Sequence, residues 1–206
     1  MIAVVDYNAG NLSSVKRALD YLGISSMITS LPVEILSADR IIVPGVGHAG
    51  SALATLRKQG IDSALREAFE NGTPLLGICL GSQIILTRSE EGPTHCLDFI
   101  AGVAARFSFS NAAMKVPHMG WNEILLKRTH PLLRHIQPGD EFYFVHSYYP
   151  LVDNDEAIFA QTDYGITFTS ALGQKNLFAT QFHPEKSGEV GLQLLRQFAD
   201  WDGCVC

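Results

Sequence analysis

One cysteine of the chain lies in a sequence that could make it a nucleophile. Cys79 is flanked by glycines in Gly77-Ile78-Cys79-Leu80-Gly81, between an apolar segment predicted as a strand and a segment predicted as a helix. This is the pattern of a nucleophile elbow, in which glycines permit a strained turn and leave room for a substrate. The N-terminus of a helix also favours the thiolate form of a cysteine. A small buried hydrophobe is the alternative interpretation, and the strand–helix context favours the nucleophile.

A nucleophilic cysteine needs a base, and His183 has the most suitable surroundings of the seven histidines. It lies in Gln181-Phe182-His183-Pro184-Glu185, at the end of a predicted strand. Pro184 favours an extended backbone at His183, and residues two apart in extended chain face the same way, so Glu185 can reach the imidazole. Together with Cys79, the pattern predicts a triad in which the carboxylate orients the ring. Taken alone, a strand-ending turn with a surface carboxylate explains His-Pro-Glu equally well.

The remaining histidines have less specific surroundings. Three lie in polar or irregular segments and are expected at the solvated surface: His95, His130 and His135. His48 and His118 follow glycine-containing turns and are candidates for positions near the pocket. His146 lies within an apolar predicted strand, where a hydrogen-bonded core residue is the expected role.

A second turn could supply backbone donors to the same reaction. Pro44-Gly45-Val46-Gly47 follows a predicted strand, and its N–H groups suit the oxyanion that forms when a thiolate attacks an amide. We therefore predict an oxyanion strip at Gly45, Val46 and Gly47. An ordinary turn is the alternative, because Pro-Gly usually marks one.

Predicted strands and helices alternate in the first half of the chain, which places these residues at the ends of strands. The predicted strands cover residues 2–6, 40–43 and 74–78; the predicted helices cover 12–22 with Asn11 as N-cap, 49–71 with a break at Gly60, and 80–87. This alternation predicts an α/β fold with a doubly wound, mostly parallel sheet and helices on both faces.

The second half of the chain has a different pattern. Residues 89–120 are irregular, with strands expected near 103–109, and a final helix is predicted for 189–201. Between them lie closely spaced strands, which predict antiparallel additions to the sheet: 142–147, 157–161, 166–171 and 177–182. We predict a single domain over residues 1–206, with the last few residues a frayed tail.

Composition excludes several classes of function. Hydrophobic residues make up 47% of the chain, which supports a sizeable core, and a net charge of −6 without any basic cluster argues against nucleic acid as a partner. The longest apolar stretch, 74–87, is interrupted by glycine and polar residues, and the N-terminus lacks a basic leader, so we expect no membrane association and a cytoplasmic location. The cysteines at 79, 96, 204 and 206 form neither a disulfide framework nor a metal-binding pattern, and no cofactor or metal is predicted.

Several segments together resemble a known family. Gly-Ile-Cys-Leu-Gly-Ser-Gln at 77–83 and Gln-Phe-His-Pro-Glu-Lys-Ser at 181–187 are similar to the class I, triad-type glutamine amidotransferases. Four further segments resemble, within this family, the glutamine amidotransferase subunits of imidazole glycerol phosphate synthase: residues 6–11, 44–47, 117–122 and 144–149. The similarity extends from Ile2 to about Phe198.

The resemblance implies a flavodoxin-like fold and assigns roles to individual residues. It implies that Cys79 is the nucleophile, that His183 is the general base and acid, and that Glu185 is the orienting carboxylate. It implies that L-glutamine is held by Gln83, Ser147 and Tyr148, and that a partner subunit is faced by Trp121, Tyr143 and Lys186. The partner of a heterodimer would be a (β/α)₈ cyclase, which uses the ammonia to make imidazole glycerol phosphate and aminoimidazole carboxamide ribonucleotide in histidine biosynthesis.

Two alternatives remain open from the sequence. The chain could supply ammonia to a different synthase, such as a sugar amidotransferase or the pyridoxal phosphate system. It could also be a non-catalytic, flavodoxin-like binding or receiver domain, which Asp6 at the end of the first strand would fit. A receiver needs further acids and a lysine at strand ends, and Val43-Pro44 and Ile78-Cys79 stand there instead.

Overall fold

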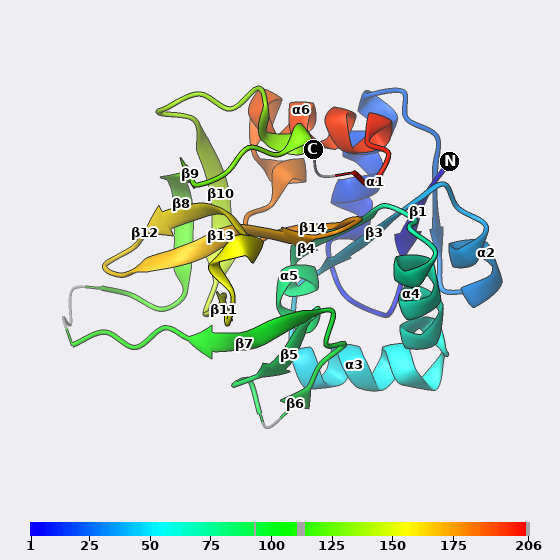
Figure 1. The fold of residues 1–206 in the computed structure, drawn as a ribbon, viewed down its shortest axis with the longest axis horizontal. Helices are drawn as coiled ribbons and strands as arrows, with labels where there is room; N and C mark the ends of the chain where they lie inside the picture. The colour runs from blue at the N-terminus through cyan, green and yellow to red at the C-terminus, as the bar shows by residue number, and fades with distance from the viewer. Residues whose placement is uncertain (93, 111–113, 205–206) are drawn as a thin grey trace.

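An eight-stranded sheet forms the centre of the computed structural model (Figure 1), which describes residues 1–92, 94–110 and 114–204. Its strand order is β2-β1-β3-β4-β14-β13-β12-β9. The first five of these strands are parallel: β2 (Ser26–Thr29), β1 (Ile2–Val5), β3 (Arg40–Gly45), β4 (Leu75–Cys79) and β14 (Leu177–Thr180). Three antiparallel strands complete it: β13 (Thr167–Gln174), β12 (Ile158–Asp163) and β9 (Leu125–Leu126). The predicted mostly parallel sheet with antiparallel additions is confirmed. The strand predicted at 177–182 as one of these additions is β14, which is parallel to β4 and antiparallel only to β13.

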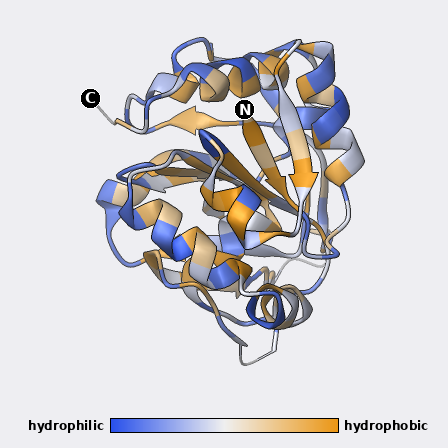
Figure 2. Cartoon of the chain, turned by 90° about the vertical axis from the view of Figure 1, so that its right-hand side faces the viewer, coloured by the Kyte–Doolittle hydropathy of each residue, from blue (hydrophilic) through white to orange (hydrophobic). Residues whose placement is uncertain are grey.

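Helices cover both faces of this sheet. One face carries α1 (Leu12–Tyr21) and α6 (Gly188–Asp200); the other carries α2 (Pro32–Leu36), α3 (Ala49–Lys58), α4 (Ile61–Glu70) and α5 (Leu80–Ile84). Strand β1 shows how the two layers are separated, because Ile2 and Val4 pack with α1 and α6 while Ala3 and Val5 pack with α3 and α4. Figure 2 shows the apolar strands enclosed by helices whose polar sides face outwards.

The predicted helix over 80–87 ends early. Helix α5 stops at Ile84, and β5 (Leu86–Ser89) begins two residues later. A short apolar run fits a helix or a strand equally well, and here pairing with β7 (Ile100–Arg106) decides in favour of the strand. The break predicted at Gly60 is confirmed, since Gly60 has φ 70° and separates α3 from α4. Strand β2 and helix α2 were not predicted.

Two small sheets hold most of the remaining second half. Strands β11 (Tyr148–Val152), β7, β5 and β6 (Thr94–His95) form one, and β10 (Glu141–His146) pairs with β8 (His118–Glu123) in the other. The prediction that the strand at 142–147 joins the central sheet was therefore wrong. Its partner β8 comes from the segment predicted to be irregular, and β7 lies three residues before its predicted place.

The strands that carry the candidate site lie side by side in the central sheet. Strand β4 ends in Cys79, with β3 on one side leading to Gly45 and β14 on the other leading to His183. Because the three strands are parallel, their carboxyl ends meet at one edge of the sheet, which is where ligands bind in open α/β folds.

The C-terminal end is described as far as Cys204. Its thiol is exposed and free, and its carbonyl accepts a hydrogen bond from the Trp201 indole. Cys206, which was predicted to lie in a frayed tail, is outside the described residues. Within the described ranges, no helix is both long enough and apolar enough to span a membrane.

Candidate active site

Cys79 occupies a strained turn between β4 and α5. Its backbone has φ 53° and ψ −102°, a conformation that is uncommon for a residue with a side chain, and its side chain is nearly buried. The glycine after it is required by close packing, since a Cβ at Gly81 would lie 2.0 Å from the Val43 carbonyl oxygen. The turn therefore combines backbone strain with tight contact, as a nucleophile elbow does.

His183 and Glu185 form a hydrogen-bonded pair with both side chains fully buried. Nδ1 of His183 lies 2.7 Å from Oε1 of Glu185, and the extended backbone of His183 (φ −101°, ψ 94°) aligns the two as expected for residues two apart. The other ring nitrogen, Nε2, has no hydrogen-bond partner among the described residues. It is therefore free for a reacting group.

The electrostatics of this pair favour an imidazolium. Burial by itself lowers the pKa of His183, but the neighbouring Cys79 and Glu185 more than offset burial and raise the pKa to about 10. Negative charge on the neighbouring groups stabilises the protonated ring. The site is thus suited to hold a proton on His183 beside Cys79.

Asn11 completes the environment of the pair, a role that sequence analysis missed. It stands at the N-cap position of α1, as predicted, but its side chain makes no capping hydrogen bond. Instead, Nδ2 donates to Glu185 Oε1 at 2.6 Å and lies 3.3 Å from His183 Nδ1. The cap prediction was wrong for the side chain because a cap oxygen is aimed at the helix N–H groups by an extended backbone, whereas Asn11 has a left-handed backbone (φ 82°, ψ −2°) and its amide is turned towards Glu185.

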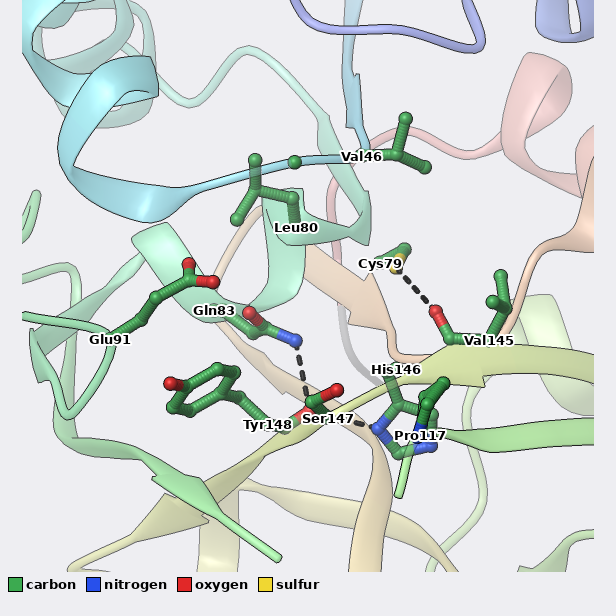
Figure 3. A pocket seen from close by; sticks show the side chains of 11 residues that line it. Val46, Cys79, Leu80, Gln83, Glu91, Pro117, Val145, His146, Ser147 and Tyr148 are labelled. Atoms are coloured by element: carbon green, nitrogen blue, oxygen red, sulfur yellow. Dashed lines mark hydrogen bonds between the residues drawn. The ribbon is translucent and has the colours of Figure 1, made fainter. Parts of the chain in front are cut away.

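A pocket of about 280 Å³ opens beside Cys79 (Figure 3). Its lining includes five residues predicted for the oxyanion strip or for glutamine: Val46, Gly47, Gln83, Ser147 and Tyr148. The Gln83 amide is fixed from two sides, because Nε2 donates to the Tyr148 carbonyl at 2.9 Å and to Gln181 Oε1 at 3.0 Å. Its own carbonyl oxygen is therefore left as an acceptor for a ligand.

Gly45 is outside the lining of the pocket, to which Val46 and Gly47 belong. It is the last residue of β3, paired with Cys79, and a Cβ there would lie 2.1 Å from the Tyr7 hydroxyl oxygen. The buried Tyr7 donates a hydrogen bond to the Pro44 carbonyl at 2.7 Å. Tyr7 is thus bonded to the start of the strip, and its hydroxyl occupies the space that a side chain at position 45 would need.

Glu91 is a second residue that sequence analysis missed. It lines the pocket, and one of its carboxylate oxygens accepts a hydrogen bond from the Ala49 N–H at the start of α3 at 2.7 Å. In Figure 3 the Glu91 carboxylate and the Gln83 carbonyl oxygen lie on the same side of the pocket. Two acceptors at one end of a pocket suit a cationic group such as an α-ammonium.

The three residues predicted to face a partner lie together on the surface. The Trp121 and Tyr143 rings meet edge to face at 6.1 Å, and Lys186 Nζ lies 6.0 Å from the centre of the Tyr143 ring. We call them the docking cluster. Trp121 is 53% exposed, which is unusual for so large an apolar side chain, and the Tyr143 ring lies 6.5 Å from the His183 ring. The docking cluster is thus adjacent to the candidate triad.

The structure corrects the prediction for His130 and, in part, that for His135, which is half-buried with Nε2 2.9 Å from the Val190 carbonyl oxygen. His130, predicted at the solvated surface, is buried against Phe178 with ring centres 4.2 Å apart, and Nδ1 accepts a hydrogen bond from the Leu132 N–H. His95 is exposed as expected, and His48 is exposed at the start of α3, outside the lining of the pocket. His118 and His146 are both buried, and His146 lines the pocket.

Comparison with known proteins gives consistent matches over the chain. A family model described as glutamine amidotransferase class-I matches residues 3–200. "Imidazole glycerol phosphate synthase subunit HisH" of Dehalococcoides mccartyi (strain CBDB1) is 47% identical over 96% of this chain and 96% of its own. The protein of the same name from Moorella thermoacetica is 46% identical, over 97% and 94%. A solved structure described as a glutamine amidotransferase has the same fold, with a TM-score of 0.73 at 20% identity, over 99% of this chain and all of the other.

Proposed function

Since this chain belongs to the class I glutamine amidotransferase family, we propose that it is the glutamine-hydrolysing subunit of an imidazole glycerol phosphate synthase. In this role it converts L-glutamine to glutamate and ammonia and passes the ammonia to a cyclase subunit. The cyclase uses it to form imidazole glycerol phosphate and aminoimidazole carboxamide ribonucleotide in histidine biosynthesis, a cytoplasmic pathway. The β14 strand, inserted between β4 and β13, ties both halves of the chain into one sheet and supports a single domain.

One observation carries the proposal. Adjacent parallel strands bring a cysteine on a strained strand-to-helix turn beside a fully buried His183–Glu185 pair, next to a pocket. A cysteine with a purely structural role needs no strained backbone. It also needs no neighbouring imidazole like that of His183, whose pKa is raised in part by Cys79. The arrangement is that of a Cys-His-acid triad for acyl transfer.

The reaction follows from these positions. The Cys79 thiolate attacks the side-chain amide carbon of glutamine, and a tetrahedral oxyanion forms. Protonated His183 gives its proton to the amide nitrogen, the C–N bond breaks, and ammonia leaves a glutamyl thioester on Cys79. A water molecule then loses a proton to His183 and attacks the thioester. Glutamate departs, and the thiolate–imidazolium pair is restored.

Backbone N–H groups at two strand ends supply the oxyanion site in this proposal. Leu80 is the first residue of α5, so its N–H points out of the helix end beside Cys79, and Leu80 lines the pocket. Val46 and Gly47 also line the pocket, and Figure 3 shows Val46 on the same side of it as Leu80. Tyr7 supports the strip through its hydrogen bond to the Pro44 carbonyl. One such donor typically contributes about 10²–10³ in rate.

Specificity for glutamine comes from the opposite end of the pocket. The Glu91 carboxylate and the Gln83 carbonyl oxygen would receive the α-ammonium group, and the 147–148 segment forms the wall next to them. A side-chain amide of glutamine length would then reach Cys79. Glutamate, with a negative carboxylate in place of the amide, would be disfavoured by the Cys79 thiolate.

The docking cluster is the surface on which the proposal places the cyclase. An exposed indole, a half-buried tyrosine and a lysine are residue types that contribute strongly to protein interfaces or steer association. Lys186 directly follows Glu185, so a contact on Lys186 is one residue from the triad. Lys186→Ala should weaken association with the cyclase or uncouple glutaminase from acceptor binding, and calorimetric titration measures the first effect.

A two-donor assay tests the proposal. The chain is combined with the cyclase of its own organism, and product formation is measured with glutamine and, separately, with ammonium as the nitrogen source. Cys79→Ser should remove glutamine-dependent synthesis and leave ammonium-dependent synthesis nearly intact. Cys96→Ser is the matched control, since Cys96 is buried outside the pocket and should leave both activities intact.

Two other outcomes would redirect the proposal. Equal loss of both activities in Cys79→Ser would mean that the cysteine supports the fold or the interface. Glutamine hydrolysis that is intact but serves a sugar-modifying synthase and not the cyclase would retain the glutaminase and replace the partner.

A further inference from the structure

Two buried histidines form a hydrogen-bonded chain that begins at the glutamine pocket. His146 Nδ1 lies 2.8 Å from the Tyr148 carbonyl oxygen, and His146 Nε2 lies 3.0 Å from His118 Nδ1. Asn122 Nδ2 lies 3.3 Å from His118 Nε2 and also donates to the Asp163 carbonyl at 2.9 Å. The triad does not use this chain, although its members come from two segments that carried the family resemblance.

The directions of the hydrogen bonds in the chain follow from the Tyr148 carbonyl when both imidazoles are neutral. A carbonyl oxygen only accepts, so His146 Nδ1 carries a proton and, in the neutral ring, Nε2 accepts from His118 Nδ1. His118 Nε2 in turn accepts from the Asn122 amide, whose oxygen is already occupied by the Glu123 N–H. Burial favours this neutral state, because it lowers the pKa of His118 to about 4 and that of His146 to about 3.

Aromatic packing holds this chain in place. The His118 ring is stacked between the rings of Tyr164, at 4.0 Å, and Phe144, at 4.9 Å, both with an interplanar angle of 27°. Phe107 and Phe168 meet the His118 ring edge to face and the His146 ring at a tilt. Such enclosure leaves His118 little freedom to move.

The chain ends at two functional places. At one end the Tyr148 carbonyl also accepts from Gln83 Nε2, the amide that offers its oxygen to the substrate. At the other end Asn122 is the residue next to Trp121 of the docking cluster. Strand register strengthens the link, because His118 is paired with His146 and Trp121 with Tyr143 in the same β8–β10 ladder.

We propose that His118 and His146 are positioning residues that fix the Tyr148 carbonyl and, through it, the Gln83 amide in the orientation that binds glutamine. Asn122 anchors this connection to the strand that carries Trp121. The inference rests on the proposed glutaminase function, because it names the determinant of substrate affinity at that same pocket. It places control of glutamine affinity in a neutral network that is separate from the proton-transferring pair.

Variants at His118 test the network through the glutamine KM. In the complex with the cyclase, His118→Leu removes a donor and an acceptor and leaves His146 Nε2 buried without a partner. The glutamine KM should rise about tenfold, with kcat within about threefold of the wild type. His118→Asn keeps an N–H near the position of Nδ1, so it should return the KM to within about threefold of the wild-type value.

A milder variant separates the loss of the network from a general loss of folding. Asn122→Ala removes the outer end of the chain from a half-buried site, together with the hydrogen bonds to the Asp163 carbonyl and from the Glu123 N–H. The KM should rise about threefold, and the melting temperature should fall by no more than about 4 °C. A KM unchanged in all three variants would overturn the proposal, as would His118→Asn behaving like His118→Leu, since shape would then be the cause. A wild-type complex that does not hydrolyse glutamine would instead overturn the proposed function.

Discussion

The buried His183 and the buried pair His118 and His146 differ in protonation state. His183 lies between the Cys79 sulfur and the Glu185 carboxylate, and its pKa is raised to about 10 despite burial. His146 is equally enclosed, but it is bonded to a backbone carbonyl and to the neutral His118, and burial lowers its pKa to about 3. Burial alone thus does not determine the charge of an imidazole; the charges around it do.

The difference suggests a division of labour within one pocket. A histidine held as a cation beside a thiolate can give and take a proton during the reaction. A neutral histidine with both nitrogens engaged has no free position for a proton and contributes geometry. The pocket lies between the two groups, since Cys79 and His146 both line it.

Replacing each histidine by glutamine is the strongest test of this comparison. His183→Gln removes the proton carrier, and glutamine-dependent kcat should fall by at least about 10³, as expected when a member of a triad is lost. His146→Gln should change kcat by less than about tenfold and act mainly on KM. Steady-state glutaminase assays on the complex measure both. Similar losses of kcat in the two variants would abolish the distinction.

Changing the carboxylate should alter the charge of His183 while preserving its orientation. Glu185→Gln keeps an oxygen that can accept from Nδ1, but it removes a charge that helps to raise the pKa of His183. We expect kcat/KM to fall by about 10–100-fold, and the decline of activity at alkaline pH to begin at a lower pH, because His183 then loses its proton earlier. A pH profile of kcat/KM measures the shift.

The matched control for that profile is His118→Leu. It should leave the alkaline decline where it is in the wild type, because His118 is already neutral. An alkaline decline at the same pH in Glu185→Gln and in the wild type would show that another group controls it.

Much of the triad could be predicted because its signals are local. Glycines at fixed offsets mark the turn at Cys79, and Pro184 between His183 and Glu185 determines that their side chains face the same way. The parallel sheet order was predictable from alternating strands and helices, and it brings these strand ends to one edge.

The missed residues depend on contacts between distant segments. Asn11 reaches His183 and Glu185 across more than 170 residues, and nothing near Asn11 in the sequence distinguishes this from an ordinary helix cap. The contact between His118 and His146 requires the β8–β10 register, and β8 lies in a segment that showed no strand pattern. Glu91 follows β5, which was not predicted as a strand and whose first two residues were predicted as helix, so its place in the pocket could not be inferred.

Asn11 offers a smaller test on the charged side of the comparison. Asn11→Ala removes the hydrogen bond to Glu185 Oε1 and leaves the ion pair with His183 in place. We expect kcat to fall about three- to tenfold, since a hydrogen bond to a charged group contributes roughly 1.5–3 kcal/mol and part of this is recovered by relaxation. Asn71→Ala, at the exposed end of α4, is the control and should leave kcat unchanged. An unaltered kcat in Asn11→Ala would restrict Asn11 to a structural role.

Substitution of His130 should have the smallest effect on activity, because this residue lies outside the pocket. Its protonation should affect only the stability of the fold. Burial, with a smaller contribution from Arg134, lowers its pKa from 6.5 to about 3. A histidine with a lowered folded-state pKa must stay neutral in the native protein, so the stability that depends on it is fully present above about pH 6.5 and is lost as the pH falls towards 3. At about 1.36 kcal/mol per pH unit, this amounts to about 2 kcal/mol between pH 6.5 and pH 5.

The variant His130→Phe tests this dependence, because it keeps a ring stacked on Phe178 and removes the titrating group. The variant should therefore be less stable at pH 7.5, where it lacks the hydrogen bond from Leu132, and should lose less stability than the wild type on acidification. Urea unfolding at pH 7.5, 6.5 and 5.0 measures both free energies, and glutaminase activity at pH 7.5 should stay within about twofold. Parallel losses of stability in the two proteins would show that His130 is not among the groups that make the fold acid-sensitive, and would leave His118 and His146 as the neutral histidines responsible.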